Sequence, residues 1–345
     1  MSMSGWVNSV FRRCSWRRIV ILLLLPGACI GAAPLPRTIT LATWNMEWLM
    51  TPQTVAALRP GCTGGDRPPA RVRSIPCGVA RDLARRPEDY GRLADYAQRL
   101  DADVIAIQEV DGPEAARLAF RDHDFCFTAR RAVQNNGFAI RRGRGIRFRC
   151  DADVRSLAVG HEHLRAGAQI TLFPGMPEEL HLLGVHLKSG CAGERLDSGE
   201  EACTVLARQV QPLKAWVDVQ ARAGHRFMLL GDFNRRLARE KKTARDTQGR
   251  LTNMWPELSS ADVQGARLVS LAEGRPYLKC HLTERHSAYI DHIIAGERAA
   301  RHWLPATFRR VGFVQSDAVR LKLSDHCPLS VEYRLVLQET GDDER

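Results

Sequence analysis

Five short stretches of the chain share one layout, in which a run of apolar residues is followed at once by acidic, amide or histidine side chains. The stretches are 41–47, 104–109, 182–186, 228–234 and 289–292. A sixth polar group, Ser324-Asp325-His326, stands directly before the last apolar run. Short apolar runs of this kind are typical of buried strands. Because strand ends are rigid, the polar groups mounted on them can converge at one rim of a sheet.

Four of these polar side chains are hard oxygen ligands, namely Asn45, Glu47, Glu109 and Asp325. Oxygen-rich sites without thiolates suit Mg²⁺, and also Mn²⁺ or Ca²⁺. The sequence therefore predicts a site for a divalent cation, with Mg²⁺ as the first candidate.

Five further side chains suit the hydrolysis of a phosphate ester. Asp291 could orient the imidazole of His326 and favour its charged form. Asp232 and Asn234 could position an attacking water and a phosphate oxygen. His186 could donate a proton or a hydrogen bond to the phosphate or to the leaving oxygen. Together these residues predict a metal-assisted attack of water on a phosphate ester.

Each of these residues also has a purely structural interpretation. A single Asp or Asn after a strand is more often a turn former than a catalytic group. Glu109 could be a charge at the sheet rim, and His186 could be a half-buried histidine with its hydrogen bonds satisfied. Six such segments in one chain are harder to explain in this way, and together they favour a shared function.

The N-terminus has the pattern of a secretory signal. Residues 1–18 contain four Arg and no acidic residue, and an apolar run at 19–25 leads into a small-residue stretch that ends at Ala33. This run is far shorter than the roughly 20 apolar residues that span a membrane. We therefore predict a signal peptide at 1–33 and a periplasmic or secreted mature chain without a membrane span. Cys29 leaves a lipoprotein interpretation open.

Ten cysteines and a net charge of +11 also depend on this processing. Removal of the signal peptide removes four Arg and two Cys, which leaves a charge of about +7 and eight cysteines. An even number of cysteines in an exported protein implies disulfides. The spacing does not choose among the pairings, but we expect neighbours in the sequence to pair. These pairs are 62–77, 126–150, 191–203 and 280–327.

The elements that must carry the polar groups alternate along the chain. Apolar patterns predict strands at 37–43, 104–107, 137–141, 154–159, 168–173, 181–187, 226–230, 289–294, 309–314 and 328–336. Helices are predicted at 90–100 and at about 200–222, the second interrupted or kinked near Pro212. No linker divides residues 34–345, so we expect one domain with stacked sheets and flanking helices.

The ordered segments resemble the endonuclease/exonuclease/phosphatase superfamily, which includes pancreatic-type deoxyribonucleases, abasic-site endonucleases, sphingomyelinases and inositol-polyphosphate phosphatases. The matching motifs are Thr43-Trp44-Asn45, Ile107-Gln108-Glu109, Gly231-Asp232-Phe233-Asn234 and Ser324-Asp325-His326. The resemblance runs from residue 41 to about 335. It implies an α/β fold, a four-layer sandwich of two mixed β-sheets packed face to face and flanked by helices.

The resemblance also implies roles for the site residues. Glu109 would bind the metal with help from Asn45, Glu47 and Asp325. Asp232 and Asn234 would orient the water and the phosphate, and His326 would pair with Asp291. His186 matches the second catalytic histidine of the deoxyribonuclease branch and argues against the abasic-site branch, which often carries Tyr there.

Two basic clusters bear on the substrate. The first includes Arg141, Arg142 and Arg144, and the second follows Asn234 and includes Arg235 and Arg236. A cationic surface beside a phosphodiester site suits nucleic acid, so we predict DNA as the substrate. The clusters could also be ordinary solvated surface. A sphingomyelinase-like enzyme that acts on a lipid headgroup or an inositol phosphate is the main alternative, and an inactive binding module on the same fold is a third.

Overall fold

The computed structural model describes residues 37–58, 77–130, 132–160, 164–260, 262–282 and 284–335. The predicted signal peptide at 1–33 lies outside these residues, and so does Cys62, whose predicted partner is Cys77. All described residues belong to one compact unit. Among the helices in these ranges, none is both long and apolar enough to cross a membrane.

The first sheet has six strands in the order β11-β12-β1-β2-β4-β3. The strands are β1 (Thr38–Leu49), β2 (Val104–Val110), β3 (His123–Phe127), β4 (Asn135–Arg141), β11 (Trp303–Arg310) and β12 (Leu329–Arg334). The central pair, β1 and β2, is parallel, whereas β12 and β4 run antiparallel on either side of it. The sheet is therefore mixed, and the C-terminal ends of β1 and β2 lie at the same edge.

The second sheet also has six strands, in the order β5-β6-β7-β8-β10-β9. The strands are β5 (Phe148–Cys150), β6 (Ala168–Leu172), β7 (Leu180–His186), β8 (Phe227–Asp232), β9 (Leu268–Ser270) and β10 (Asp291–Gly296). Here β7 and β8 form the parallel pair, and β10 is antiparallel to β8. This sheet repeats the arrangement of the first, with a parallel pair at its centre.

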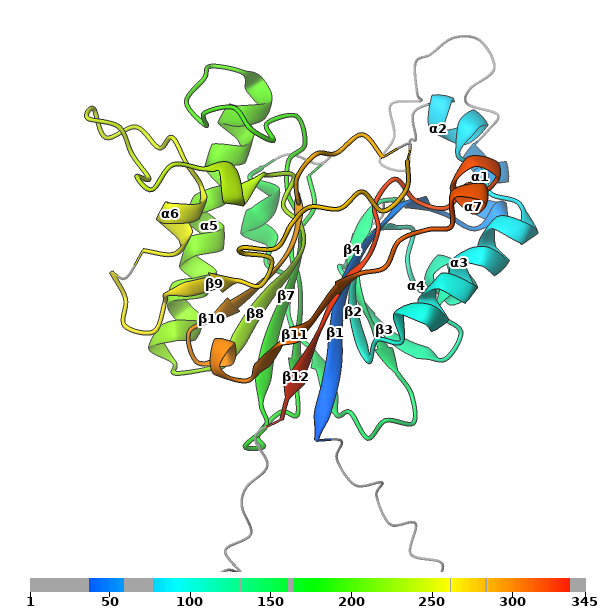
Figure 1. Ribbon diagram of the computed structural model, residues 1–345, viewed down its shortest axis with the longest axis horizontal. Helices are drawn as coiled ribbons and strands as arrows, with labels where there is room; N and C mark the ends of the chain where they lie inside the picture. The colour runs from blue at the N-terminus through cyan, green and yellow to red at the C-terminus, as the bar shows by residue number, and fades with distance from the viewer. Residues whose placement is uncertain are drawn as a thin grey trace, which may run out of the picture. The chain divides into compact units, whose positions relative to one another are not determined.

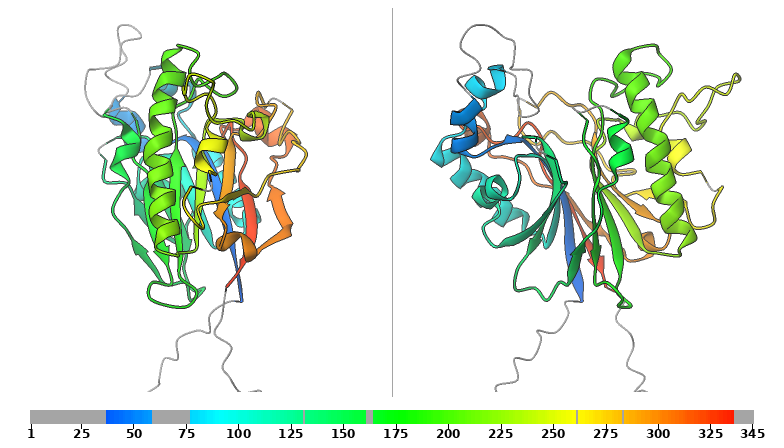
Figure 2. Two further views of the ribbon diagram at one scale, coloured as in Figure 1. Left: turned by 90° about the vertical axis from the view of Figure 1, so that its left-hand side faces the viewer. Right: turned by 180° about the vertical axis from the view of Figure 1, so that it is seen from behind.

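The layers follow from the two-residue period of the strands, because alternate side chains face opposite sides of a sheet. Leu41, Ala106 and Leu182 belong to the core between the sheets, whereas Ala42 and Leu183 face the helices outside. Figure 1 shows the two sheets packed face to face, with α3 (Pro87–Leu100) and α4 (Pro113–Ala119) on one outer side. Figure 2 shows α5 (Glu201–Arg222) lying along the other. The predicted four-layer sandwich is confirmed.

The remaining helices are short. They are α1 (Pro52–Leu58), α2 (Cys77–Asp82), α6 (Trp255–Leu258) and α7 (Gln315–Arg320), with 3₁₀ turns at Arg155–Ala158, Leu237–Arg239 and Ala299–Arg301. Two of the predicted strands are wrong in part. Residues 155–158 form a 3₁₀ turn, and β11 ends at Arg310 instead of beginning near 309. In addition, α5 continues through Pro212 without interruption.

Three predicted disulfides are confirmed, and each joins neighbours in the sequence. They are Cys126–Cys150, Cys191–Cys203 and Cys280–Cys327. The first links β3 to β5 and so joins an edge of one sheet to an edge of the other. The third fixes the loop after β9 to the segment just before β12, which carries the Ser324-Asp325-His326 motif.

Candidate active site

The polar groups predicted from the sequence meet at one rim of the sandwich. Strands β1, β2, β7 and β8 end there, and β10 and β12 begin there. The register of the second sheet places Asp232 between His186 and Asp291, its partners on β7 and β10. Asn45 lies opposite Gln108, one residue before Glu109. Both sheets therefore contribute side chains to the same small volume.

Asp232 lies at the centre of this volume and is almost fully buried. Its Oδ2 accepts hydrogen bonds from Nδ2 of Asn45 and from Nδ2 of Asn234, both at 3.1 Å. Its Oδ1 accepts from the backbone N–H of Asn234 at 2.7 Å. The Nε2 atom of His186 is 3.5 Å from Oδ2. Asp232 therefore links a residue of the first sheet with two residues from the second-sheet side, His186 and Asn234.

The close approach of β7 and β8 depends on Gly231. A Cβ at this position would lie 2.0 Å from the carbonyl oxygen of Val185, and the residue has φ +146°. A contact this short forces a shift of backbone, so no other residue fits. Gly231 therefore allows His186 and Asp232 to stand side by side at the strand ends.

The candidate metal ligands are connected through the backbone of β1. Nδ2 of Asn45 donates to Glu109 at 3.3 Å, and the N–H of Trp48 donates to the other Glu109 oxygen at 3.2 Å. The N–H of Asp325 donates to Glu47 at 3.0 Å. Glu47, Trp48, Glu109 and Asn234 are four of the seven described non-glycine residues with positive φ. Left-handed backbone of this kind costs energy and gathers at functional sites, as it does here.

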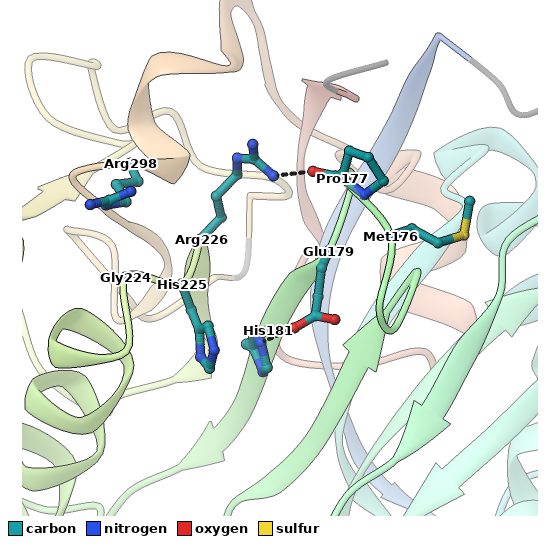
Figure 3. A pocket seen from close by; sticks show the side chains of 8 residues that line it. All are labelled: Met176, Pro177, Glu179, His181, Gly224, His225, Arg226 and Arg298. Atoms are coloured by element: carbon teal, nitrogen blue, oxygen red, sulfur yellow. Dashed lines mark hydrogen bonds and ion pairs between the residues drawn. The ribbon is translucent and has the colours of Figure 1, made fainter. Parts of the chain in front are cut away.

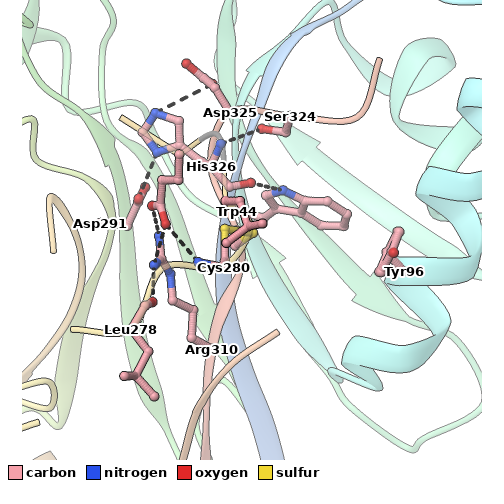
Figure 4. The surroundings of a disulfide bond; sticks show 12 residues. Trp44, Tyr96, Leu278, Cys280, Asp291, Arg310, Ser324, Asp325 and His326 are labelled. Carbon is pink, nitrogen blue, oxygen red and sulfur yellow. Dashed lines mark hydrogen bonds and ion pairs between the residues drawn. A yellow bond between two sulfur atoms is a disulfide. The ribbon is translucent and has the colours of Figure 1, made fainter. Parts of the chain in front are cut away.

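His326 and Asp291 form a buried pair. Nδ1 of His326 donates to Oδ2 of Asp291 at 2.8 Å (Figure 4). The Nε2 atom of His326 lies 3.9 Å from Asp232. Burial alone would lower the pKa of His326, but the charges of Asp291 and Asp232 outweigh it and raise this pKa well above the usual value. Burial opposes ionisation of Asp291 as well, yet the positive His326 lowers its pKa on balance. The pair is therefore an imidazolium and a carboxylate.

His186 has the opposite electrostatics. Burial, followed by the positive charges of Arg165 and His326, holds the pKa of His186 well below the usual range. Its Nε2 faces Asp232 and, at 3.7 Å, Glu109. Its Nδ1 is buried without a hydrogen-bond partner among the described residues. A proton on Nε2, facing the two carboxylates, fits this surrounding best, so the site holds one neutral and one charged histidine.

The donor set fits a divalent cation. Burial, with the nearby carboxylate of Asp325, raises the pKa of Glu47 to about 7. Burial also raises the pKa of Asp232 to about 7, although His326 opposes this shift. Buried carboxyl groups that lie close together resist ionisation, and a cation bound between them stabilises their ionised form. Glu47, Glu109 and Asp325 with the amide oxygen of Asn45 make an oxygen set that suits Mg²⁺.

Two arginines at this rim were not found from the sequence. Arg85 is buried and donates to the carbonyl oxygens of Met46, Trp48, Lys322 and Leu323. It therefore ties the end of β1 to the segment that leads into Asp325 and His326. Arg85 lies in a stretch rich in Gly, Pro and Arg, and nothing in its local pattern distinguishes it from its neighbours.

Arg165 is the second arginine. Its side chain donates to the carbonyl oxygen of Leu187 at 3.3 Å, and its Nε is buried without a partner among the described residues. Its charge acts on Glu109 and Asp232. A guanidinium with spare donors beside these carboxylates can hold a phosphate oxygen. The only sequence signal is its position just before the predicted strand at 168–173.

The first basic cluster is not beside the site. Because β4 is antiparallel to β2, Arg141 lies where β2 begins, at the opposite end from Glu109. Arg141 pairs with Asp101 at 2.6 Å, Arg144 pairs with Asp103 at 2.8 Å, and Arg142 lies 3.6 Å from Asp124. The prediction that these arginines flank the catalytic groups is wrong, since the sequence does not give the direction of a strand.

The two arginines of the second basic cluster differ in how deeply they are buried. Arg235 is fully buried, where it pairs with Glu240 at 2.5 Å and donates to the carbonyl oxygen of Cys191 at 2.8 Å. It cannot contact a substrate, so that prediction is also wrong. Arg236 is half-buried and lines a cavity of about 210 Å³. The buried Arg235 lies in the wall of the same cavity, and the further basic residues that line it are Arg195, Arg239, Lys241 and Arg245. Three acids also line it, namely Glu194, Glu240 and Asp246, and the last two form ion pairs with arginines.

The comparisons agree with this geometry. The model of the Endonuclease/Exonuclease/phosphatase family matches residues 42–326, from the middle of β1 to His326. The chain belongs to this family. Its members are hydrolytic enzymes that act on phosphate esters, as phosphodiesterases, nucleases and phosphatases, and use divalent metal ions, commonly Mg²⁺. A search of curated protein sequences finds no match.

Solved structures show the same fold at low sequence identity. Truncated TDP2 from Caenorhabditis elegans is 12% identical, with a TM-score of 0.51 over 86% of the enzyme and 98% of the TDP2 chain. An endonuclease/exonuclease/phosphatase from Bacteroides vulgatus is 11% identical, with a TM-score of 0.50 over 87% of the enzyme and 99% of that chain. At these identities the likeness concerns the fold alone and does not assign a substrate.

Proposed function

We propose that the enzyme is a secreted or periplasmic Mg²⁺-dependent nuclease that hydrolyses phosphodiester bonds of DNA. The observation that carries this proposal is the basic cavity that begins at Arg236, two residues after Asn234. A polyanionic strand needs such cationic surface next to the phosphate that is cut. Three disulfides and the predicted signal peptide support an exported enzyme.

The metal would be held by Asn45, Glu47, Glu109 and Asp325. When bound, Mg²⁺ supplies positive charge that stabilises the negative charge developing on the phosphate oxygens. The remaining steps belong to side chains of the enzyme.

Asp232 is the residue placed to handle the attacking water. It accepts three hydrogen bonds that fix its orientation, so its carboxylate is held in place to accept a proton from that water. A water held between Asp232 and Asn234 would lose its proton to the Asp232 carboxylate as its oxygen attacks phosphorus. Asn234, which is anchored to Leu187 as well as to Asp232, keeps the water in line.

The two histidines act on the phosphate. His326, held as an imidazolium by Asp291, would donate a charge-assisted hydrogen bond from Nε2 to an oxygen that gains charge in the transition state. His186, neutral and protonated on Nε2, would donate to the phosphate or to the leaving oxygen. Arg165 and Arg236 would hold neighbouring phosphate oxygens.

Incubation of the mature protein with supercoiled plasmid tests the proposal directly. We expect nicking in Mg²⁺ that stops on addition of a chelator. His326→Ala should abolish it and leave the circular dichroism spectrum unchanged. Arg141→Ala is the matched control, since this residue lies at the far end of the sheet and should not change the rate. The absence of nicking with Mg²⁺, Mn²⁺ and Ca²⁺ would reject a DNA nuclease.

A lipid-headgroup phosphodiesterase is the second candidate, and one observation favours it. Leu278 and Leu282 are 71% and 76% exposed on either side of Cys280, whose disulfide partner Cys327 follows His326. Two exposed leucines next to a catalytic histidine suit contact with a lipid surface. Turnover of sphingomyelin vesicles, reduced by Leu278→Ser with Leu282→Ser, would support this candidate. No vesicle turnover by the wild type, together with full plasmid activity in the double variant, would support the nuclease.

A further inference from the structure

A third histidine stands beside the catalytic rim and takes no part in the mechanism above. The ring centre of His286 lies 5.3 Å from that of His326, and the two ring planes are tilted by 49°. The side chain is half-buried, on the loop that leads to Asp291 at the start of β10. Neither of its nitrogens has a hydrogen-bond partner in the described part of the chain, and neither is fully buried. These nitrogens are therefore open to a molecule that approaches His326.

The segment that carries His286 is fixed on its N-terminal side by Glu284. This buried carboxylate accepts hydrogen bonds from the backbone N–H of Cys280 at 2.8 Å and from a guanidinium nitrogen of Arg310 at 3.0 Å. It also accepts from the hydroxyl of Tyr277, whose ring centre is 4.6 Å from the guanidinium of Arg310. A buried polar network in which the members satisfy one another holds a single geometry. The chain just before His286 is therefore rigid.

The same segment is fixed on its C-terminal side to the chain that follows β8. The carbonyl oxygen of Ser287 accepts from the side chain of Arg239 at 3.1 Å. The carbonyl oxygen of Ile290 accepts from the backbone N–H of Phe233 at 2.9 Å. Arg239 is one of the residues that line the basic cavity described above. The loop with His286 therefore lies between His326 and this cavity.

The ring of His286 can donate one hydrogen bond to a ligand. Burial, followed by the positive charge of His326, lowers the pKa of His286, although the carboxylates of Asp291 and Asp325 oppose this shift. The ring is therefore neutral, with one N–H donor and one acceptor nitrogen. The oxygens of a phosphodiester group accept hydrogen bonds and do not donate them. The N–H of His286 therefore suits a phosphate group that lies beside the one held at His326.

We propose that His286 is a substrate-binding residue that donates a hydrogen bond to the phosphate next to the one that is cut, on the side that leads to the basic cavity. The inference rests on the proposed function, since it takes the substrate to be a nucleic-acid strand. The strand would pass from His326 over His286 to Arg239 and the cavity that Arg239 lines. The enzyme would then bind a polynucleotide better than an isolated phosphodiester.

A comparison of two substrates in Mg²⁺ tests this contact. The first is a short single-stranded DNA oligonucleotide, which has neighbouring phosphates, and the second is bis(4-nitrophenyl) phosphate, which has only one. We expect His286→Ala to raise KM for the oligonucleotide about 10-fold, because a hydrogen bond to a charged group is lost. The same variant should leave kcat and KM for the small diester unchanged.

Further variants identify the kind of contact. His286→Asn and His286→Gln each keep an N–H donor, near the position of one or the other ring nitrogen, and at least one of them should lower KM toward the wild-type value. His286→Phe keeps a flat ring without a donor and should behave like His286→Ala. The matched control is His225→Ala, because His225 is also half-buried but lies at the opposite end of β8, in a cavity of about 170 Å³ (Figure 3). It should leave the kinetics with both substrates unchanged.

Each other outcome would overturn a distinct step. Wild-type kinetics of His286→Ala on both substrates would overturn the contact and leave the nuclease standing. An equal loss on both substrates would overturn it too, because His286 would then support His326 and not the strand. Recovery by His286→Phe alone would replace the hydrogen bond with stacking. A wild type that hydrolyses the small diester and does not cut the oligonucleotide would refute the DNA nuclease itself.

Discussion

Replacement of Gly231 by Ala should damage both the stability and the activity of the enzyme. The new Cβ would lie 2.0 Å from the carbonyl oxygen of Val185, whereas real Cβ atoms essentially never come within 3.0 Å of such an atom. Strands β7 and β8 must then separate by about 1 Å. The adjacent hydrogen bond from Leu187 N–H to the Asp232 carbonyl, now 2.9 Å, would become too long to count as one.

The magnitude follows from two effects. An Ala at φ +146° costs about 1–3 kcal/mol in backbone strain. Loss of one or two strand hydrogen bonds adds about 1 kcal/mol each. The free energy of unfolding should therefore fall by about 2–5 kcal/mol. A displacement of about 1 Å between His186 and Asp232 should also slow plasmid nicking by about 100-fold, because the reaction depends on their relative position.

Gly112 provides the matched control. It has φ +110°, but a Cβ there would meet no atom within 4 Å. Gly112→Ala therefore carries the backbone strain without the clash, and should be more stable than Gly231→Ala by about 2 kcal/mol and almost fully active. Urea unfolding gives the stabilities, and nicking rates are measured where both variants are folded. If the two variants had equal stability and Gly231→Ala nicked plasmid at the wild-type rate, the argument from strand spacing would be refuted.

Three further changes test other parts of the site. Asp291→Asn removes the charge that raises the pKa of His326, so activity should fall at least about 100-fold. Because the pKa of His326 then falls, the decline of activity at alkaline pH should begin at a lower pH, which a pH–rate profile would detect. An unchanged profile would count against an imidazolium at this position. Cys327→Ser removes a disulfide with a sequence separation of 47, so the free energy of unfolding in a denaturant titration should fall by about 4 kcal/mol. Activity should fall as well, because the segment that carries His326 is no longer fixed by the disulfide. Arg236→Gln should weaken DNA binding and make it less dependent on salt concentration, whereas Arg141→Gln should leave this salt dependence unchanged. If the two variants showed the same salt dependence, the basic cavity would not contact the DNA strand.

Much of the catalytic rim could be predicted because strand ends are local features of the sequence. Asn45, Glu109, His186 and Asp232 each come at most two residues after an apolar run, and the regular pairing of their strands shifts or ends at these positions. The order of the motifs resembles that of a known superfamily, and this resemblance predicts the four-layer sandwich that the structure has. The sequence predicts that disulfides form but does not choose the pairs, and the three pairs in the structure join the neighbours that we expect.

The sequence by itself determined which residues stand at the ends of strands, and therefore which chemistry the rim can carry. Only the tertiary structure decided which other residues lie there, because that depends on the direction and pairing of strands that are distant in the chain. The antiparallel course of β4 carries Arg141 away from Glu109, and burial turns Arg235 into a structural ion pair. The same packing brings Arg85 and Arg165 to the rim and sets His286 beside His326.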